Sequence, residues 1–417
     1  MIDADAGLSL EPIRWRMWFA PSLIALALAG PQGAAPSSSP SPSPEAQPTP
    51  FFDARKHPTR YLGPGRDAPE PQGLSEVRLA YFGPAQEDHP EWGQAWRGAN
   101  LALEEANAGG GYRRLPFRLL SAWSDNPWGS GVADLTRLVF DSQVWAIVGG
   151  VDGTTTHLAE QIVVKVGVPL VSPGNTDLSV NMTNVAWTFT CLPTDDQQLA
   201  LVAALLAQVK DAPFVTLATT DHDARATLSA YRAALGARAP ALHVDLAPGA
   251  LEAADVAARV VAARPHAALI VAGARDAGHL VRALRGAGFE GAIFGSATLG
   301  RRAFLVEARG AAEGVVVPLL YEPSPAWDAF AQRFRRRFGV APDDLAGETY
   351  DAVNLTVAAI RRGGLNRVRI LEALRALAPW PGVTGTHDWD LTGRNRRPAG
   401  LAQIRGGRLV PLPAPRP

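Results

Sequence analysis

Cysteine is nearly absent from this chain of 417 residues, which contains only Cys191. One cysteine excludes an intramolecular disulfide, and a position so far from the N-terminus excludes a lipid-modified N-terminal cysteine. Cys191 lies in the segment Thr190-Cys191-Leu192-Pro193, which is typical of the end of a strand that enters a crossing between lobes. We therefore expect a buried structural thiol rather than a catalytic nucleophile.

The chain also lacks net charge, because 40 Lys and Arg residues balance 40 Asp and Glu residues. Neither sign forms a long run, so the sequence has no electrostatic footprint for nucleic acid or for an anionic membrane surface. A composition of 47% hydrophobic and 19% charged residues is normal for a globular protein long enough for two domains. We therefore expect a small-molecule partner and no nucleic acid.

Motifs of several enzyme classes are missing as well. No Gly-x-Gly-x-x-Gly follows the first predicted strand, and neither a Walker motif nor Gly-x-Ser-x-Gly occurs. The eight histidines are scattered without metal-ligand spacing. The densest polar group, residues 387–390, is interpreted as a strand and hairpin turn with a solvated or hinge role. We therefore predict no enzyme activity, no catalytic residues, no metal and no cofactor.

The N-terminal region resembles a targeting segment. Arg14 and Arg16 precede the apolar segment 17–29, and small residues follow it, as in a secretory signal. The apolar segment is too short to span a bilayer comfortably. Acidic residues before the arginines leave an uncleaved anchor as an alternative, so residues 1–30 are predicted to be a signal peptide or membrane anchor. Either role places the rest of the chain in the periplasm or otherwise outside the cytoplasm.

Residues 31–75 are predicted to be a disordered Pro/Ser-rich linker. Pro, Ser, Ala and Gln dominate residues 31–50, and such a composition cannot bury enough apolar area to offset chain entropy. A Pro- and Gly-rich stretch continues to residue 73, so the folded part is expected to begin near Glu76.

From Val77 onward, short apolar strands alternate with amphipathic helices, which predicts parallel sheets. The alternation restarts after Thr194, which indicates a second lobe. The predicted fold is α/β, with two doubly wound parallel-sheet lobes joined by a multi-crossing hinge. Lobe 1 is assigned residues 76–193 plus about 320–385, and lobe 2 residues 194–319 plus about 386–413.

Two successive strand, loop and helix units occupy residues 144–177. Thr154 and Thr155 offer N-cap hydroxyls to the first helix, and the loop 172–176 follows the next strand. Because the carboxyl ends of neighbouring parallel strands meet at one edge of a sheet, these loops predict a binding crevice. Thr and Gly are also ordinary turn and cap residues, so a purely structural role stays open.

Four stretches carry a resemblance by their order and spacing. They are the strand and glycine-punctuated helix of residues 77–110, then residues 148–156, 168–173 and 348–353. Together they resemble the type I periplasmic solute-binding proteins of the leucine, isoleucine and valine-binding kind, which deliver small molecules to ABC transporters. The resemblance covers about residues 77–412 and implies a two-lobed trap that closes on its ligand.

The resemblance implies a ligand site in lobe 1. Trp92 falls on the aromatic position before the first helix. Gly174, Asn175 and Thr176 fall on the positions that hold the two charged ends of an amino acid. Thr154 and Thr155 follow Gly153, which stands where the amino-acid binders carry a serine.

The resemblance breaks down in lobe 2, where the acidic residue that meets a substrate ammonium is replaced by Ala297. Asp223 is the expected substitute, with Asp152 of lobe 1 as a second choice, because a buried ammonium without a counter-charge is costly. Trp123 and Trp128 are expected either to add aromatic surface or to pack in the core.

We therefore expect an extracytoplasmic protein that traps an amino acid, an amide or a related compound and delivers it to an ABC transporter permease. The alternative is a tethered ligand-sensing or scaffold module on the same fold, without a transporter. The predicted ligand-binding set is Trp92, Thr154, Thr155, Gly174, Asn175, Thr176 and Asp223.

Overall fold

Five parallel strands form the sheet of lobe 1. The computed structural model describes residues 61–124 and 126–413, all within one unit, Thr49–Pro417. The strands are β1 (Val77–Phe82), β2 (Phe117–Ala122), β3 (Ile147–Gly149), β4 (Leu170–Ser172) and β5 (Thr188–Thr190). They lie in the order β2-β1-β3-β4-β5, and each neighbouring pair is parallel, as predicted.

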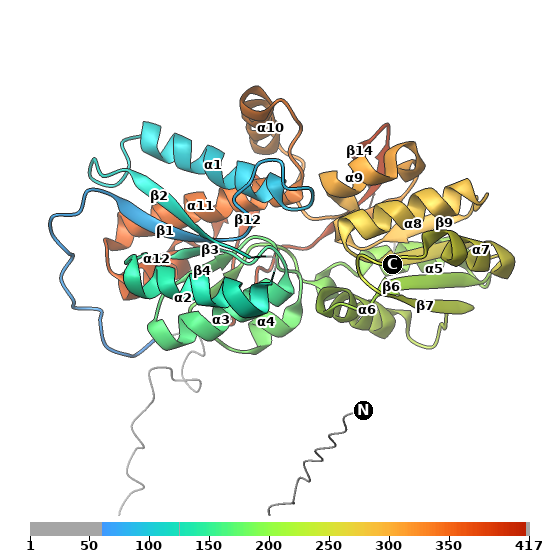
Figure 1. The fold of residues 1–417 in the computed structure, drawn as a ribbon, viewed down its shortest axis with the longest axis horizontal. Helices are drawn as coiled ribbons and strands as arrows, with labels where there is room; N and C mark the ends of the chain where they lie inside the picture. The colour runs from blue at the N-terminus through green and yellow to red at the C-terminus, as the bar shows by residue number, and fades with distance from the viewer. Residues whose placement is uncertain (1–60, 125, 414–417) are drawn as a thin grey trace, which may run out of the picture. The chain divides into compact units, whose positions relative to one another are not determined.

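Helices cover both faces of this sheet (Figure 1). The helices of lobe 1 are α1 (Gly93–Ala108), α2 (Val132–Asp141), α3 (Gly153–Val166), α4 (Leu178–Met182), α10 (Pro325–Phe338), α11 (Asp344–Gly363) and α12 (Arg367–Leu377). The strand order reverses after β2, so right-handed connections place α1 and α2 on opposite faces. Helix α11 packs on α1 so closely that a Cβ atom at Gly98 would lie 2.1 Å from the carbonyl oxygen of Ala346.

Lobe 2 contains a seven-stranded mixed sheet in the order β14-β13-β10-β9-β8-β6-β7. Its strands are β6 (Phe214–Thr219), β7 (Leu242–Leu246), β8 (Ala267–Val271), β9 (Ala292–Gly295), β10 (Val316–Leu319), β13 (Gly400–Arg405) and β14 (Arg408–Leu412). Its helices are α5 (Ala200–Val209), α6 (His222–Leu235), α7 (Ala253–Ala263), α8 (Ala274–Gly286) and α9 (Arg302–Ala308). Strands β6 to β10 are parallel, whereas β13 and β14 join antiparallel.

Shorter elements complete the chain. These are the helical turns η1 (Pro127–Gly131), η2 (Asp195–Gln197), η3 (Ala297–Gly300) and η4 (Arg309–Ala312), and the two-stranded ladder of β11 (Trp380–Pro381) and β12 (Thr386–His387).

Separate segments connect the lobes and are bonded to one another. The amide of Asn395 donates to the carbonyl oxygen of Cys191 at 2.5 Å, and that of Gln197 donates to the carbonyl oxygens of Asn395 at 3.1 Å and Arg397 at 3.2 Å. The buried guanidinium of Arg397 also pairs with the buried carboxylate of Glu348. Hydrogen bonds between connections restrict the ways in which the lobes can move.

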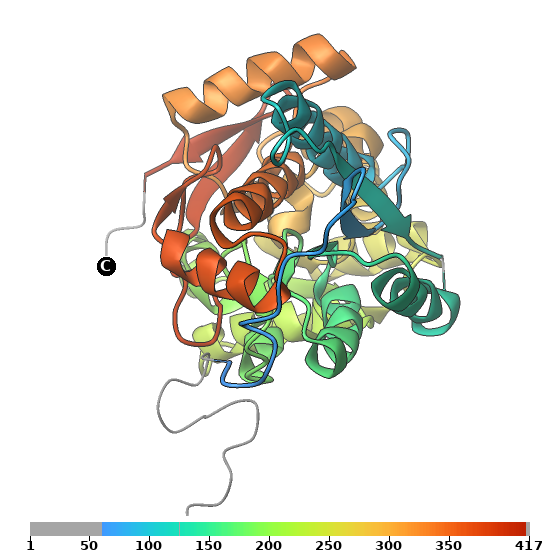
Figure 2. The ribbon, with the colours of Figure 1, turned by 90° about the vertical axis from the view of Figure 1, so that its left-hand side faces the viewer.

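Residues 61–75 correct the end of the predicted linker, because they pack on lobe 1 (Figure 2). The ring of Tyr61 contacts that of Trp187 with centroids 4.7 Å apart, and the amide of Asn366 donates to the carbonyl oxygens of Gly65, Arg66 and Ala68. Composition does not reveal such specific contacts. Residues 31–60 of the predicted linker lie outside the described residues.

Strands β3 and β4 begin later than the apolar pattern indicated. The apolar runs 144–148 and 168–171 in the two strand, loop and helix units predict strands from residues 144 and 168, but residues 144–146 and 168–169 are buried ahead of the strands proper. An apolar run in the sequence therefore indicates which residues are buried, but not which residue forms the first pair of the sheet. Within residues 61–124 and 126–413, no helix is long and apolar enough to cross a membrane. The leader predicted at residues 1–30 lies outside that range.

Candidate functional site

A cavity of about 880 Å³ lies between the lobes. It is lined by loops that follow strands of both sheets, where open α/β sheets bind ligands. The lining includes six predicted site residues, Trp92, Thr154, Thr155, Gly174, Thr176 and Asp223, together with Asp152 and Trp123. The side chain of Trp128 is not among those described.

Asn175 is fully buried and is not among the residues that line the cavity. Its side-chain amide donates to the carbonyl oxygen of Asp177, and its side-chain oxygen accepts from the Asp177 amide, both at 3.1 Å. The neighbouring Gly174 permits a close approach of two loops, because a Cβ atom there would lie 2.3 Å from the backbone of Val151. These two residues shape the crevice through its backbone.

The N-terminus of α3 is capped from its own lobe by Asp152. The carboxylate of Asp152 accepts from the Thr155 amide at 2.7 Å and from the Thr155 hydroxyl at 2.5 Å. The Asp152 backbone amide donates in return to the Thr155 hydroxyl oxygen at 3.3 Å, and the two reciprocal backbone-to-side-chain bonds form a capping box. The hydroxyl of Thr155, one of the predicted ligand groups, is therefore already hydrogen-bonded within the protein.

The same helix end binds Asp223, which lies on α6 of lobe 2. The carboxylate of Asp223 accepts from the Gly153 amide at 2.6 Å, from the Thr154 amide at 3.3 Å and from the Thr154 hydroxyl at 2.7 Å. A helix N-terminus attracts negative charge through its free amides and its dipole. Thr154 was predicted to bind the ligand, but in this structure its hydroxyl binds a carboxylate of the other lobe.

Several carboxyl groups at the cavity are held away from their ordinary ionisation. Burial, and next the Asp223 carboxylate, raise the pKa of Asp152 to about 7. Burial also raises the pKa of Asp195 well above its usual value, against the hydrogen bonds from Thr176 and Thr227. Burial raises the pKa of Glu91 as well, although the nearby Arg301 acts to lower it. A cation placed beside any of these carboxyl groups would stabilise its ionised form.

Arg301 places a positive charge at the cavity from lobe 2. The side chain is buried, and its guanidinium carbon lies 5.4 Å from the centroid of the Trp92 ring. Its Nε atom has no hydrogen-bond partner among the described residues. Trp123 of lobe 1 is similar, since its buried indole nitrogen lacks a hydrogen-bond partner in the described part of the chain.

Arg301, Glu91 and Asp195 were missed by sequence reasoning. Glu91 directly precedes Trp92, and Arg301 lies four positions after Ala297, so both adjoin positions that the resemblance had singled out. Ala297 lines the cavity and packs beside Leu192 and Leu320. The family's acidic residue is therefore absent at Ala297, and the chain instead carries the positive charge of Arg301 four positions further along.

The solvated role that was one interpretation of residues 387–390 is wrong for His387 and Trp389, which are buried. His387 is completely buried and lies 3.3 Å from the carboxylate of Asp351, which also accepts from the amide and hydroxyl of Thr384. The indole nitrogen of buried Trp389 donates to the carbonyl oxygen of Thr190 at 3.0 Å. Cys191 is buried, in agreement with a structural thiol.

Comparisons with known proteins agree with this architecture. A family model of periplasmic binding proteins matches residues 76–408. An amino acid binding protein of Pseudomonas aeruginosa is 25% identical over 329 residues, which are 77% of this chain and 87% of that protein.

Two solved structures are similar in fold. One is the branched-chain amino acid transporter substrate binding protein LivJ of Streptococcus pneumoniae with isoleucine, at TM-score 0.73 and 21% identity over 81% of this chain and 100% of that one. Another is a solute binding protein of an ABC transporter from R. palustris with benzoate, at TM-score 0.71 and 17% identity over 82% and 96%. The chain therefore belongs to the periplasmic binding protein family, as its sequence indicated, and is a solute-binding protein.

Proposed function

We propose that this protein captures a small zwitterionic solute, such as an amino acid, outside the cytoplasm and delivers it to the permease of an ABC transporter. The solute is held between the lobes and released unchanged. Family membership and the amino acid binding relative support this class of ligand. Isoleucine and benzoate, the ligands of two structural neighbours, both combine a carboxylate with an apolar group.

The observation that carries the proposal is Arg301 at the cavity. Guanidinium binds carboxylates through paired, charge-assisted hydrogen bonds. The buried Nε–H of Arg301, which has no partner within residues 61–124 and 126–413, favours such an acceptor. Trp92 lies beside this guanidinium and gives the apolar part of a ligand a flat surface to pack on.

The ammonium end of the solute is assigned to the carboxyl groups of Asp152, Asp195 and Glu91. Burial raises the pKa of each, and an ammonium in contact would restore the ionised form. This places the ligand carboxylate at lobe 2, although the predicted ligand-binding set included Thr154 and Thr155 at the N-terminus of α3. The change follows from Asp223, which occupies that helix end.

Among the predicted site residues, Trp92, Gly174 and Thr176 are proposed to face the solute. Thr154 and Asp223 are proposed instead to hold the lobes together, because they are hydrogen-bonded to each other across the two lobes. Thr155 is proposed to hold Asp152 at the start of α3. Asn175 is proposed to act only through the shape of its loop.

Calorimetric titration with matched compounds tests the ligand class. The set contains an amino acid, its amide, its decarboxylated amine and its deaminated acid, and the full-length protein is expected to bind the amino acid best. Arg301→Gln should abolish the preference for the acid over the amide. Arg275→Gln is the control, since Arg275 also lines the cavity but is exposed.

Equal affinity for the amino acid and its amine would contradict the role of Arg301. Uptake of the labelled solute by cells lacking the protein tests delivery. Uptake that persists would favour the sensor or scaffold role over transport.

A further inference from the structure

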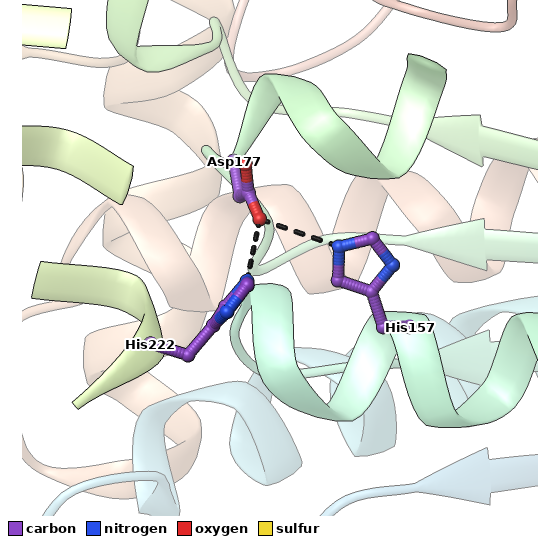
Figure 3. Close-up of side chains that lie close together, drawn as sticks. All are labelled: His157, Asp177 and His222. Carbon is purple, nitrogen blue, oxygen red and sulfur yellow. Dashed lines mark hydrogen bonds and ion pairs between the residues drawn. The ribbon is translucent and has the colours of Figure 1, made fainter. Parts of the chain in front are cut away.

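Two histidines and an aspartate from the two lobes point toward one another (Figure 3). His157 lies on α3 and Asp177 caps the N-terminus of α4, both in lobe 1, while His222 is the first residue of α6 in lobe 2. Their Nε2 atoms approach the same oxygen, Asp177 Oδ2, at 3.3 Å from His157 and 2.7 Å from His222. The predicted site did not include these residues.

The surroundings orient the three donor atoms. Glu160 Oε2 lies 3.4 Å from Nδ1 of His157, on the far side of the ring from Asp177. The Ser179 amide donates to Asp177 Oδ1 at 2.8 Å, which leaves Oδ2 to the histidines and to the Ser179 hydroxyl at 2.6 Å. A carboxylate on the second nitrogen of a histidine is the usual support of a metal ligand.

Spacing and donor type fit a small divalent cation. One ligand atom from each residue lies within 4.8 Å of the others. Zinc binds nitrogen at about 2.0–2.1 Å, so two ligand atoms of a tetrahedral site are about 3.3 Å apart. We propose that His157, Asp177 and His222 bind a Zn²⁺ ion that bridges the two lobes, with water as a fourth ligand.

The position allows entry of an ion and a water molecule. A second cavity, of about 470 Å³, is lined by His157, Glu160 and His222. The His222 side chain is 49% exposed, whereas that of Asp177 is 5% exposed. Asp177 is therefore a carboxylate ligand in a largely water-excluded place.

A second group of potential ligands, Cys191, Glu348 and His387, is less suitable. All three side chains are completely buried, and Glu348 already pairs with Arg397. The guanidinium would repel a metal ion placed against that carboxylate.

The zinc site joins the lobes, because two ligands come from lobe 1 and one from lobe 2. Its three protein ligands are in place only when α3 and α6 are in contact. Zinc is therefore expected to favour the arrangement with the lobes together and to slow the release of a trapped solute, since a ligand shifts the equilibrium toward the state it binds better.

Zinc binding itself is the test, and it needs no knowledge of the solute. Full-length, untagged protein is treated with a chelator and then titrated with ZnSO₄ by calorimetry, with metal content measured after dialysis. One zinc per chain is expected, with affinity reduced at least tenfold in His222→Gln and in His157→Gln. Glu160→Gln should weaken binding about 10-fold or more, as loss of supporting groups does.

His243→Gln and Cys191→Ala are the controls. His243 also faces a carboxylate, that of Asp245 at 3.1 Å, but only lobe 2 contributes to that pair. Both controls should bind zinc as the unaltered protein does. The proposal is overturned if the unaltered protein binds no zinc, or if His222→Gln, shown by circular dichroism to be folded, binds it with unchanged affinity.

Discussion

The carboxylate of Asp223 lies 2.6 Å from the backbone amide of Gly153, so a residue of lobe 2 caps a helix of lobe 1. Both bonded groups belong to the protein. This hydrogen bond therefore holds the two lobes together independently of any solute. The adjacent His222 faces Asp177 at 2.7 Å, so the start of α6 contacts lobe 1 through two consecutive side chains.

Asp223→Ala is expected to let the lobes separate. Hydrogen bonds to a charged group contribute about 1.5–3 kcal/mol each, and the helix end would also lose its anion. We expect a larger radius of gyration for the solute-free protein in small-angle X-ray scattering, and release of the solute about tenfold faster. Asp211→Asn, at an exposed position of lobe 2, should leave the scattering unchanged. Identical scattering from Asp223→Ala and the unaltered protein would show that the contact does not hold the lobes.

Gly153→Ala should disrupt the same contact from the opposite side. A Cβ atom there would lie 2.7 Å from Oδ1 of Asp223 and 2.9 Å from Cβ of Asp177. The double variant Gly153→Ala with Asp223→Ala should therefore open no further than either single variant, because residues that share one contact are not additive. Scattering of the four proteins measures this, and fully additive changes would refute a shared contact.

Stability should fall as the pH rises from about 4 to 7, and Asp152 is expected to contribute. Its pKa is raised from 3.8 to about 7, so the folded state binds the proton more tightly than the unfolded state. The contribution is complete below pH 3.8 and disappears as the pH passes the folded pKa. Denaturant unfolding at several pH values should show a flatter dependence in Asp152→Asn, since asparagine also caps helices well. Parallel pH curves for the two proteins would rule out this role for Asp152.

Deleting residues 61–75 should lower the melting temperature. The chain starting at residue 76 loses the Tyr61 ring contact and the bonds from Asn366, whereas a chain starting at residue 61 keeps them. A loss of about 1–2 kcal/mol corresponds to a decrease of several degrees, measured by circular dichroism. Equal melting temperatures of the two chains would mean that the segment adds no stability.

The fold was predictable because its signals are local and repeated. Apolar strands alternate with helices along the whole folded part, and Gly167 after α3 has the left-handed conformation that ends a helix. The loops around Thr154 and Gly174 were placed at the crevice by the rule for parallel strands, and they do line the cavity.

The chemistry of the cavity was harder to predict. Asp223 lines the cavity, but its carboxylate binds the N-terminus of α3. Whether it can reach that helix depends on the distance between the lobes, which the sequence does not reveal. Arg301 follows the short turn η3, and no periodic pattern directs its side chain toward Trp92. His157 and His222 are far apart in the sequence, so spacing along the chain gives no sign of their shared partner.

The order in which the chain visits the lobes affects how the protein is made. Strand β10 pairs with β13, whose Ala402 and Ile404 belong to the buried core of lobe 2, and the core of lobe 1 includes residues of α11 and α12. Neither core is complete until its late segments have left the ribosome. We therefore expect both lobes to reach their final packing only late in synthesis.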